Sequence, residues 1–310
     1  MVGSFVSRTR RPGPLVALSI AYLVLTSGVM IWRGISVSPD YLLVILVPIA
    51  LLSGRLLGYL RDWVPFVAIF LAYEAMRGIA PKTEIRPHVG DLAGIETGLF
   101  LGHDPTAFLQ SHIGLSHTLA LVCTVVYFCH FIFPLGVGMV LWLVDRTQYL
   151  RFIVALVGMS FFCFAIFILF PTAPPWYAHD QGYLPGVTKL ISSALPSAVS
   201  PYYHSLNPNP VAAFPSMHAA YPLLGALALW RISRRGAVVA LGWCLVVWFS
   251  VVYLGEHYAV DVLGGIVVAL ATWALMTRVI APRVSALRTP GRSVSPEAAA
   301  TRPAEEPAVA

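Results

Sequence analysis

A histidine and an aspartate four residues apart stand out in the stretch SVVYLGEHYAVDVLGG, which covers residues 250–265. His257 and Asp261 form an i,i+4 pair, so in a helix both side chains project from one face. A carboxylate inside a membrane span is costly unless it is paired, and an imidazole N–H is a suitable partner. Such a hydrogen bond fixes the tautomer of the ring and leaves the other nitrogen able to act as a nucleophile.

A second histidine, His218, occurs in the stretch FPSMHAAYPLL, near the start of another apolar run. The chain then crosses to the basic turn RISRRG and returns to residue 257, so the two crossings predict that His218 and His257 lie at the same depth. A second imidazole facing the first can give or take a proton near neutral pH. The parts suit nucleophilic attack on an ester by one histidine, with the other serving the leaving group.

Three other interpretations of these residues remain open. His257 and Asp261 could be a structural pair that locks helices together. His218, His257 and Asp261 could bind Zn²⁺, although no Cys or HExxH pattern supports a zinc site. They could also form a proton relay in a transporter, for which Glu74 is the chief other ionisable group deep in an apolar run. The preferred interpretation requires no metal or other cofactor.

The elements that position these residues are apolar helices. The chain has 310 residues, of which 58% are hydrophobic and 11% are charged, whereas a soluble domain carries about 25% charged residues. Many apolar runs approach the ~20 residues that cross a bilayer as a helix. The sequence therefore predicts an all-α polytopic membrane protein with about eight transmembrane helices. They span roughly 14–33, 40–60, 63–80, 117–143, 149–170, 215–232, 236–254 and 257–280.

The second and third predicted spans are separated by a short turn around Arg61 and Asp62. The first apolar run is long for a signal peptide and lacks a small-residue cleavage site, which favours a retained helix. The four cysteines all fall inside apolar runs and are interpreted as buried small hydrophobic residues. The net charge of +6 is not interpreted as a signal for nucleic-acid binding.

The distribution of basic residues predicts the orientation. Most arginines lie beside one set of predicted loops, and such residues favour the cytoplasmic side. Both termini are therefore expected in the cytoplasm of a multi-pass protein of the plasma or inner membrane, with the active site on the extracytoplasmic side. Segments 81–116, 171–214 and 255–256 would then face outward.

Three segments lie outside the predicted spans. Segment 81–116 is expected to form short amphipathic helices at the outer interface. The stiff, aromatic segment 171–214 is expected to be an ordered cover over the site, although Trp176 and Tyr177 could equally be interfacial anchors. Residues 282–310 hold almost no large apolar groups and are predicted to be a disordered cytoplasmic tail.

The histidine-bearing segments resemble the second and third signature motifs, PSGH and SRxxxxxHxxxD, of the type 2 phosphatidic acid phosphatase (PAP2) superfamily. The residues on these motifs are Pro215, Ser216, His218, Ser250, His257 and Asp261. Met217 stands in place of the motif glycine and Val251 in place of the motif arginine. The resemblance implies a six-helix catalytic core at 63–281, preceded by a cytoplasmic segment and two transmembrane helices at 1–62.

The stretch FPTAPPWY, at 170–177, is similar to the branch of that superfamily that contains fungal inositol phosphorylceramide synthase. The first superfamily motif, KxxxxxxRP, is absent at its usual spacing, and KTEIRP at 82–87 is a shorter version. The candidate substrate-binding residues are Lys82, Arg86, Pro174, Trp176, Tyr177 and Ser216.

The resemblance also implies a mechanism. His257 would attack phosphorus to form a phosphohistidine, with Asp261 orienting it. His218 would protonate the departing lipid oxygen and then deprotonate an acceptor hydroxyl or water. The N-termini of the predicted helices that start near residues 215 and 257 would bind the phosphoryl oxygens.

The absence of the motif arginine affects the expected reaction type. Arginine binds a phosphate dianion through two parallel hydrogen bonds, which few other residues can form. Its loss favours a lipid phosphotransferase, which moves a phospho-headgroup from a phospholipid donor to an acceptor hydroxyl. A phosphatase acting on a lipid phosphate, for example a polyprenyl phosphate, is the alternative. A non-catalytic lipid-binding or transport protein is a third candidate. The intact set of two histidines and one aspartate disfavours it.

Overall fold

The computed structural model describes residues 13–32, 39–77, 85–130, 132–195 and 211–283. In these ranges the regular secondary structure is helical, and the β-type pairing consists of isolated bridges. Five helices are long and apolar enough to cross a membrane, or six if one bent pair is a single span. The all-α, polytopic class predicted from the sequence is therefore confirmed. The five helical stretches are Gly13–Met30, Leu56–Tyr73, Arg146–Leu169, Arg234–Tyr253 and Ala259–Arg283.

The predicted span at 215–232 is a shorter helix in the structure. It appears as α12 (Met217–Leu229), which has 13 residues. At 1.5 Å per residue this helix is about 20 Å long, less than the ~30 Å of a bilayer core. Nearly all of its residues are buried, because α7, α8, α13 and α14 surround it. The prediction of a full span here was wrong, since a helix enclosed by others is as apolar as one that faces lipid.

The turn between the second and third predicted spans lies elsewhere than expected. Helix α2 (Pro39–Leu52) ends and α3 (Leu56–Arg77) begins around Gly54, whose φ of 68° favours glycine. The predicted turn at Arg61 and Asp62 was wrong, because both residues lie inside α3. Asp62 instead accepts hydrogen bonds from Arg146 at 2.6 Å and from the indole of Trp142 at 3.0 Å. The acidic residue inside this apolar run therefore marks a contact between α3 and the start of α8, not a turn.

The predicted span at 117–143 is broken. Helices α6 (His117–Phe128) and α7 (Ile132–Val144) are bent by 45° relative to each other. The longest helix, α8 (Arg146–Leu169), follows, and the side chain of Asp145 caps its N-terminus by accepting from the backbone N–H of Thr147 and Gln148. Helix α1 (Gly13–Trp32) packs against α2 and α7.

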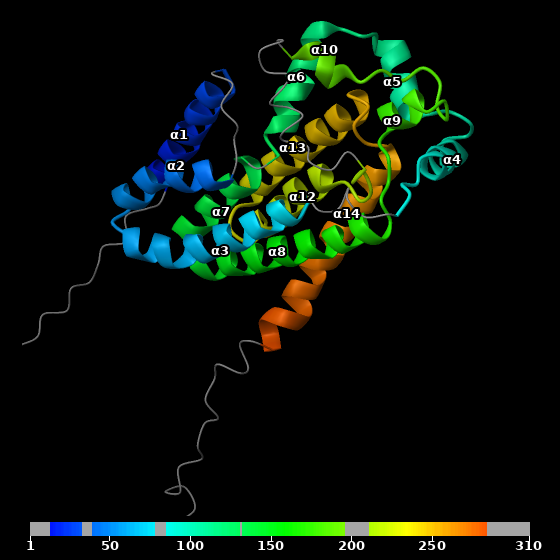
Figure 1. The fold of residues 1–310 in the computed structure, drawn as a ribbon. Helices are drawn as coiled ribbons and strands as arrows, with labels where there is room; N and C mark the ends of the chain where they lie inside the picture. The colour runs from blue at the N-terminus through cyan, green and yellow to red at the C-terminus, as the bar shows by residue number, and fades with distance from the viewer. Residues whose placement is uncertain (1–12, 33–38, 78–84, 131, 196–210, 284–310) are drawn as a thin grey trace, which may run out of the picture.

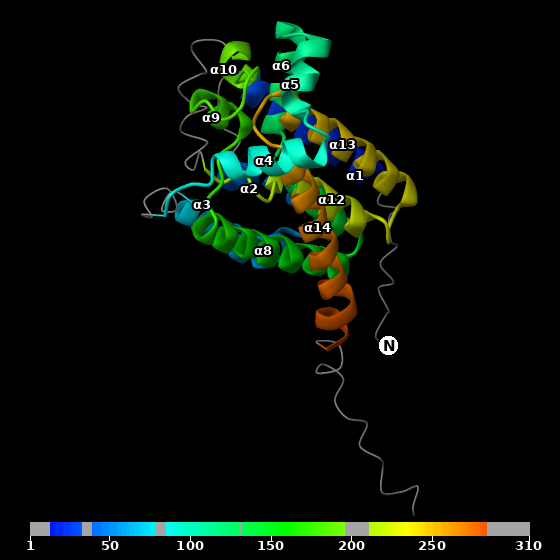
Figure 2. The ribbon, with the colours of Figure 1, turned by 90° about the vertical axis from the view of Figure 1, so that its right-hand side faces the viewer.

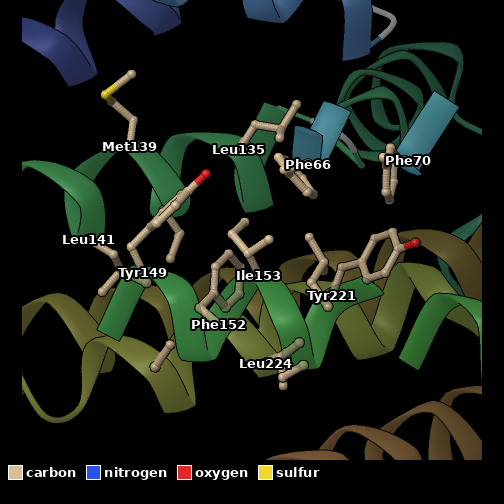
Figure 3. Packing of buried hydrophobic residues seen from close by; sticks show 14 of the residues in the cluster. Phe66, Phe70, Leu135, Met139, Leu141, Tyr149, Phe152, Ile153, Tyr221 and Leu224 are labelled. Carbon is tan, nitrogen blue, oxygen red and sulfur yellow. The ribbon is translucent and has the colours of Figure 1, made fainter. Parts of the chain in front are cut away.

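Helices α3, α7, α8 and α12 build the main core (Figure 3). Aromatic rings from α3 pack against those of α8 and α12. In a membrane such contacts stabilise the bundle through van der Waals packing, because lipid tails are as apolar as the side chains. The labelled core residues are Phe66, Phe70, Leu135, Met139, Leu141, Tyr149, Phe152, Ile153, Tyr221 and Leu224.

Four short helices gather at one end of the bundle, around the turn between α13 (Arg234–Tyr253) and α14 (Ala259–Leu275) (Figure 1). They are α4 (Gly90–Leu99), α5 (Pro105–Ile113), α9 (Pro175–Asp180) and α10 (Leu190–Ala194). The short helices predicted for 81–116 are thus present as α4 and α5. The π-helical turn Met276–Ile280 extends α14 away from this end (Figure 2).

Two adjacent glycines let α14 approach the start of α12 closely. A Cβ atom on Gly265 would lie 2.3 Å from the backbone oxygen of Ser216, and one on Gly264 would lie 2.5 Å from the ring of Phe214. Real Cβ atoms do not come this near to a backbone oxygen, so a side chain at residue 265 would push the helices apart. The glycine pair therefore sets the distance between the helix that carries Asp261 and the helix that carries His218.

Candidate active site

The two predicted catalytic histidines lie side by side. His218 is in the first turn of α12, and His257 lies in the turn that connects α13 and α14. The Nδ1 atom of His218 is 3.2 Å from the Nε2 atom of His257. The structure thus confirms that His218 and His257 meet, although α12 is shorter than the predicted crossing.

The other ring nitrogen of His257 faces two acceptors. Its Nδ1 atom lies 3.0 Å from the backbone oxygen of Ala213 and 3.5 Å from Oδ2 of Asp261. Both are acceptors, so the hydrogen-bond network assigns the proton to Nδ1 and the lone pair to Nε2. The sequence predicted that Asp261 orients the ring, and the carbonyl of Ala213 is a second, nearer partner that it did not reveal.

Asp261 is fully buried and links the start of α14 to the start of α12. Its Oδ2 atom accepts the backbone N–H of Tyr258 at 2.9 Å, and its own backbone oxygen accepts the N–H of Ser216 at 2.9 Å. Within the described part of the chain, Oδ1 has no hydrogen-bond partner. The carboxylate lies where it can orient the imidazole of His257 through its Nδ1 atom.

Aromatic rings hold His218 on its other sides. Its ring centroid lies 4.1 Å from that of Tyr127 and 4.1 Å from that of His130. His130 also stacks on Tyr221 of α12, with 4.9 Å between the centroids. The sequence reasoning missed His130, although a histidine inside an apolar run is a signal of function in membrane proteins. The bend between α6 and α7 lies next to this residue.

Ser216 occupies the N-cap position of α12. Its hydroxyl oxygen accepts the backbone N–H of Ala219 at 3.3 Å, and its side chain is fully buried. Serine is a preferred N-cap residue for this reason. The structure therefore explains Ser216 by its role in starting the helix, and contact with substrate stays a prediction.

A carboxylate occupies the N-terminus of α14. Oε1 of Glu96 accepts the backbone N–H of Ala259 at 2.7 Å, and Oε2 accepts that of Val260 at 2.9 Å. The N–H of Tyr258 is taken by Asp261. The expectation that this helix start binds phosphoryl oxygens was wrong, because its N–H groups already have acceptors within the protein. Burial raises the pKa of Glu96 to about 7.

The segment that follows α8 is hydrogen-bonded to the chain just before each of the two histidines. Thr172 forms isolated bridges with His88 and Ala212, and its hydroxyl accepts the N–H of Phe214 at 2.7 Å. The backbone N–H of Trp176 donates to the oxygen of Gly255 at 3.2 Å. The described part of the predicted cover is thus ordered beside the α13–α14 turn, whereas 196–210 lies outside the described residues.

Within the described part of the chain, the structure does not bring the basic residues predicted to bind substrate into contact with the two histidines. Arg86 is exposed, two residues before His88, and Lys82 lies outside the described residues. Lys189, which the sequence reasoning did not select, has its Nζ atom 3.5 Å from the centroid of the Trp176 ring, and burial lowers its pKa. Pro174 is buried, and Trp176 and Tyr177 are half-buried at the start of α9.

The described residues include no group of three or more His, Cys, Asp and Glu side chains arranged to hold a metal ion. The described cysteines are all free thiols. The expectation that catalysis needs no cofactor stays a prediction.

The helical bundle brings two histidines and a buried aspartate together at one end, an arrangement that suits group transfer on protein side chains. The profile of the PAP2 superfamily matches residues 91–275, and the chain belongs to this superfamily. It is an enzyme of the PAP2 type, a phosphotransferase or phosphatase acting on a lipid.

Similar proteins share one activity in their names. The chain is 28% identical to the phosphoinositol dihydroceramide synthase of Bacteroides thetaiotaomicron over 67% of this chain and 73% of that one. It is 28% identical to the catalytic subunit of the inositol phosphorylceramide synthase of Schizosaccharomyces pombe over 41% of this chain. It is 29% identical to the inositol phosphorylceramide synthase of Candida albicans over 46% of this chain. The matches span only 32% and 33% of the two fungal proteins. No solved structure matches the chain.

Proposed function

We propose that this enzyme transfers a phospho-headgroup from a phospholipid to an acceptor hydroxyl through a phosphohistidine at His257. The observation that carries the proposal is the 3.2 Å contact between Nε2 of His257 and Nδ1 of His218, with the far nitrogen of His257 bound to Ala213 and near Asp261. The names of the similar proteins favour an inositol phosphate headgroup and a ceramide-like acceptor.

In the first half of the reaction, the lone pair on Nε2 of His257 attacks phosphorus, and the bond from phosphorus to the lipid oxygen breaks. His218 gives its proton to that oxygen, so the lipid leaves as a neutral alcohol. The positive charge that develops on the imidazole of His257 is stabilised by the carboxylate of Asp261 and the carbonyl of Ala213.

In the second half, His218 takes the proton from the acceptor hydroxyl. The acceptor oxygen attacks phosphorus, the phosphorus–nitrogen bond breaks, and His257 recovers its lone pair. His218 ends with the proton that it had at the start, so each histidine is regenerated in one turnover.

The resting contact between the rings has a consequence for donor binding. In an in-line displacement the attacking nitrogen and the leaving oxygen lie on opposite sides of phosphorus. A separation of 3.2 Å between the two nitrogens leaves no room for phosphorus between them. The donor must therefore separate the rings.

The remaining parts of the proposal concern binding and orientation. The backbone of Trp176 contacts Gly255 in the turn before His257, and the ring of Tyr177 packs against that of Trp176. Both residues are proposed to exclude water. Lys82, Arg86, Pro174 and Ser216 stay candidates for binding the donor. The site is proposed to face the extracytoplasmic side, with a catalytic core at 63–281 and cytoplasmic termini.

Lipid mass spectrometry tests this proposal. Purified enzyme is incubated with phosphatidylinositol and either a ceramide, a diacylglycerol or no added acceptor, in water enriched in oxygen-18. A new phosphodiester that carries the acceptor, together with release of diacylglycerol, supports transfer. Phosphate products that carry oxygen-18 and appear without any new phosphodiester would establish hydrolysis instead.

A further inference from the structure

Glu96 is a buried carboxylate that the mechanism above does not use. It lies on α4, which also carries Ile95 and Leu99, exposed by 51% and 60%, at the end of the bundle where the short helices gather (Figure 1). The side chain of Glu96 is 0% exposed. Glutamate is almost never fully buried unless it is paired, so its partners should reveal what it does.

Those partners are backbone N–H groups at the N-terminus of α14, the helix that carries Asp261. The N–H groups of Ala259 and Val260, which Glu96 accepts at 2.7 and 2.9 Å, belong to the first turn of α14 and have no acceptor within the helix. The N-cap residue of α14 is Tyr258, and the cap comes from a residue 163 positions earlier in the chain. A carboxylate is well suited to this place, because it also interacts favourably with the helix dipole.

Ala259 and Val260 lie between His257 and Asp261 in the sequence. The position of this first turn decides how Nδ1 of His257 meets Oδ2 of Asp261, a separation of 3.5 Å that leaves little tolerance for movement. We propose that Glu96 is a positioning residue, whose ionised carboxylate clamps the first turn of α14 and thereby holds His257 in the geometry for attack. The proposal rests on the proposed role of His257 and adds a link from the interfacial helix α4 to the nucleophile.

The clamp depends on the charge of Glu96. An ionised carboxylate accepts both N–H groups, whereas a protonated one turns an O–H donor toward one of them. Burial raises its pKa to about 7, and the charged or titratable groups around it are Asp104, Asp261 and Tyr258. None of these is a cation, so none of them offsets the effect of burial. The clamp should therefore be complete above neutral pH and weaken below it.

The ionisation of Glu96 should affect the stability of the fold in the opposite direction to its effect on activity as the pH rises. Its pKa is higher in the folded protein than the ordinary value of 4.5, so the folded state binds the proton more tightly. The stabilising contribution is present in full below the ordinary pKa and is lost as the pH rises through about 7. Activity that rises through this window while thermal stability falls is a signature that a purely structural carboxylate would not give.

The test compares Glu96→Gln with Asp91→Asn, which changes the other acidic residue of the same helix, an exposed carboxylate that contacts His88. For Glu96→Gln we expect kcat at pH 8 to fall by about tenfold or more, because small displacements of a catalytic group are costly. The KM for the donor should stay unchanged, and the rise of activity near pH 7 should disappear. Asp91→Asn should keep the wild-type rate and pH profile.

Amide hydrogen exchange gives a readout that does not depend on the reaction. At a single pH near 8, a peptide containing residues 257–262 should exchange faster in Glu96→Gln than in wild type or Asp91→Asn. Equal exchange and equal kcat in the two variants would overturn the clamp. Faster exchange in a protein shown to transfer no phospho-group would leave the clamp standing and overturn only the proposed function.

A second variant covers the case in which Glu96→Gln does not fold. Glu96→Asp keeps the charge but shortens the side chain, so it should lower kcat while keeping the dependence on pH near 7. If neither variant folds, exchange in the wild-type protein decides. Protection of Ala259 and Val260 that stays constant between pH 6 and 8, after correction for the intrinsic exchange rate, would overturn the proposal.

Discussion

The Nδ1 atom of His218 lies 3.2 Å from the Nε2 atom of His257, although 39 positions separate the two residues. Helix α13 and the short helix α12 return the chain to the place where it started, and the glycine pair at 264–265 brings α14 against α12. This contact places a ring with a free lone pair against a ring that can supply a proton.

The first prediction concerns the nucleophile. His257→Ala should lower turnover by on the order of 10³-fold or more, and Asp261→Asn should lower it strongly as well, because the amide no longer stabilises a charged ring. The double variant should be little worse than His257→Ala, since the residues act as a unit. Turnover of purified, folded protein measures this, with the exposed His112→Ala as control. Near-normal turnover in His257→Ala would disprove the assignment.

The second prediction concerns His218. His218→Ala should lower transfer from a lipid donor by about 10²–10⁴-fold, because the leaving alkoxide then receives no proton. A donor with an acidic leaving group, such as a nitrophenyl phosphodiester, does not need that proton in the first step. The nitrophenol burst should therefore survive in His218→Ala and vanish in His257→Ala. Equal loss of both reactions in His218→Ala would show that this residue acts otherwise than as an acid.

The third prediction concerns metal removal. Turnover should be unchanged after exhaustive treatment with EDTA, because the proposed mechanism assigns every proton and phosphoryl transfer to protein side chains. The measurement is kcat before and after the treatment, with divalent ions added back one at a time. Loss of activity with EDTA, restored by one divalent ion, would favour metal binding by the site.

The fourth prediction concerns orientation. In a chain whose native cysteines are replaced, one variant carries Gln181→Cys, at an exposed residue directly after α9, and another carries Arg235→Cys, at an exposed residue in the first turn of α13. An impermeant thiol reagent applied to intact cells should label the first variant and spare the second. The reverse pattern would place the chemistry at the cytoplasmic leaflet.

The fifth prediction concerns water. Because a phosphohistidine accepts any well-placed hydroxyl, a transferase must exclude water and position its acceptor. Replacing both Trp176 and Tyr177 with alanine should raise hydrolysis of the donor relative to transfer and leave formation of the intermediate largely intact. The ratio of hydrolysed to transferred product gives the answer. A parallel loss of both reactions would mean that the pair binds the donor or supports the fold.

Local patterns in the sequence were enough to predict the class of protein and the meeting of its candidate catalytic residues. The apolar runs predicted a helical membrane protein because the bilayer sets both the length and the composition of a spanning helix. The lengths of two runs predicted that His218 and His257 meet. The i,i+4 spacing predicted that Asp261 lies near His257, although His257 belongs to the turn before α14 and not to the helix itself. These inferences needed only distances along the chain.

Other parts of the site depended on packing between distant segments. The carbonyl of Ala213, the stacking of His130 on His218 and the cap from Glu96 come from segments between 44 and 163 positions away from their partners along the chain. No spacing rule predicts such contacts, because they depend on how short helices dock on the bundle. The same reason explains the short helix α12, whose apolar sequence fits a membrane span, and whose length was decided only by the helices that enclose it.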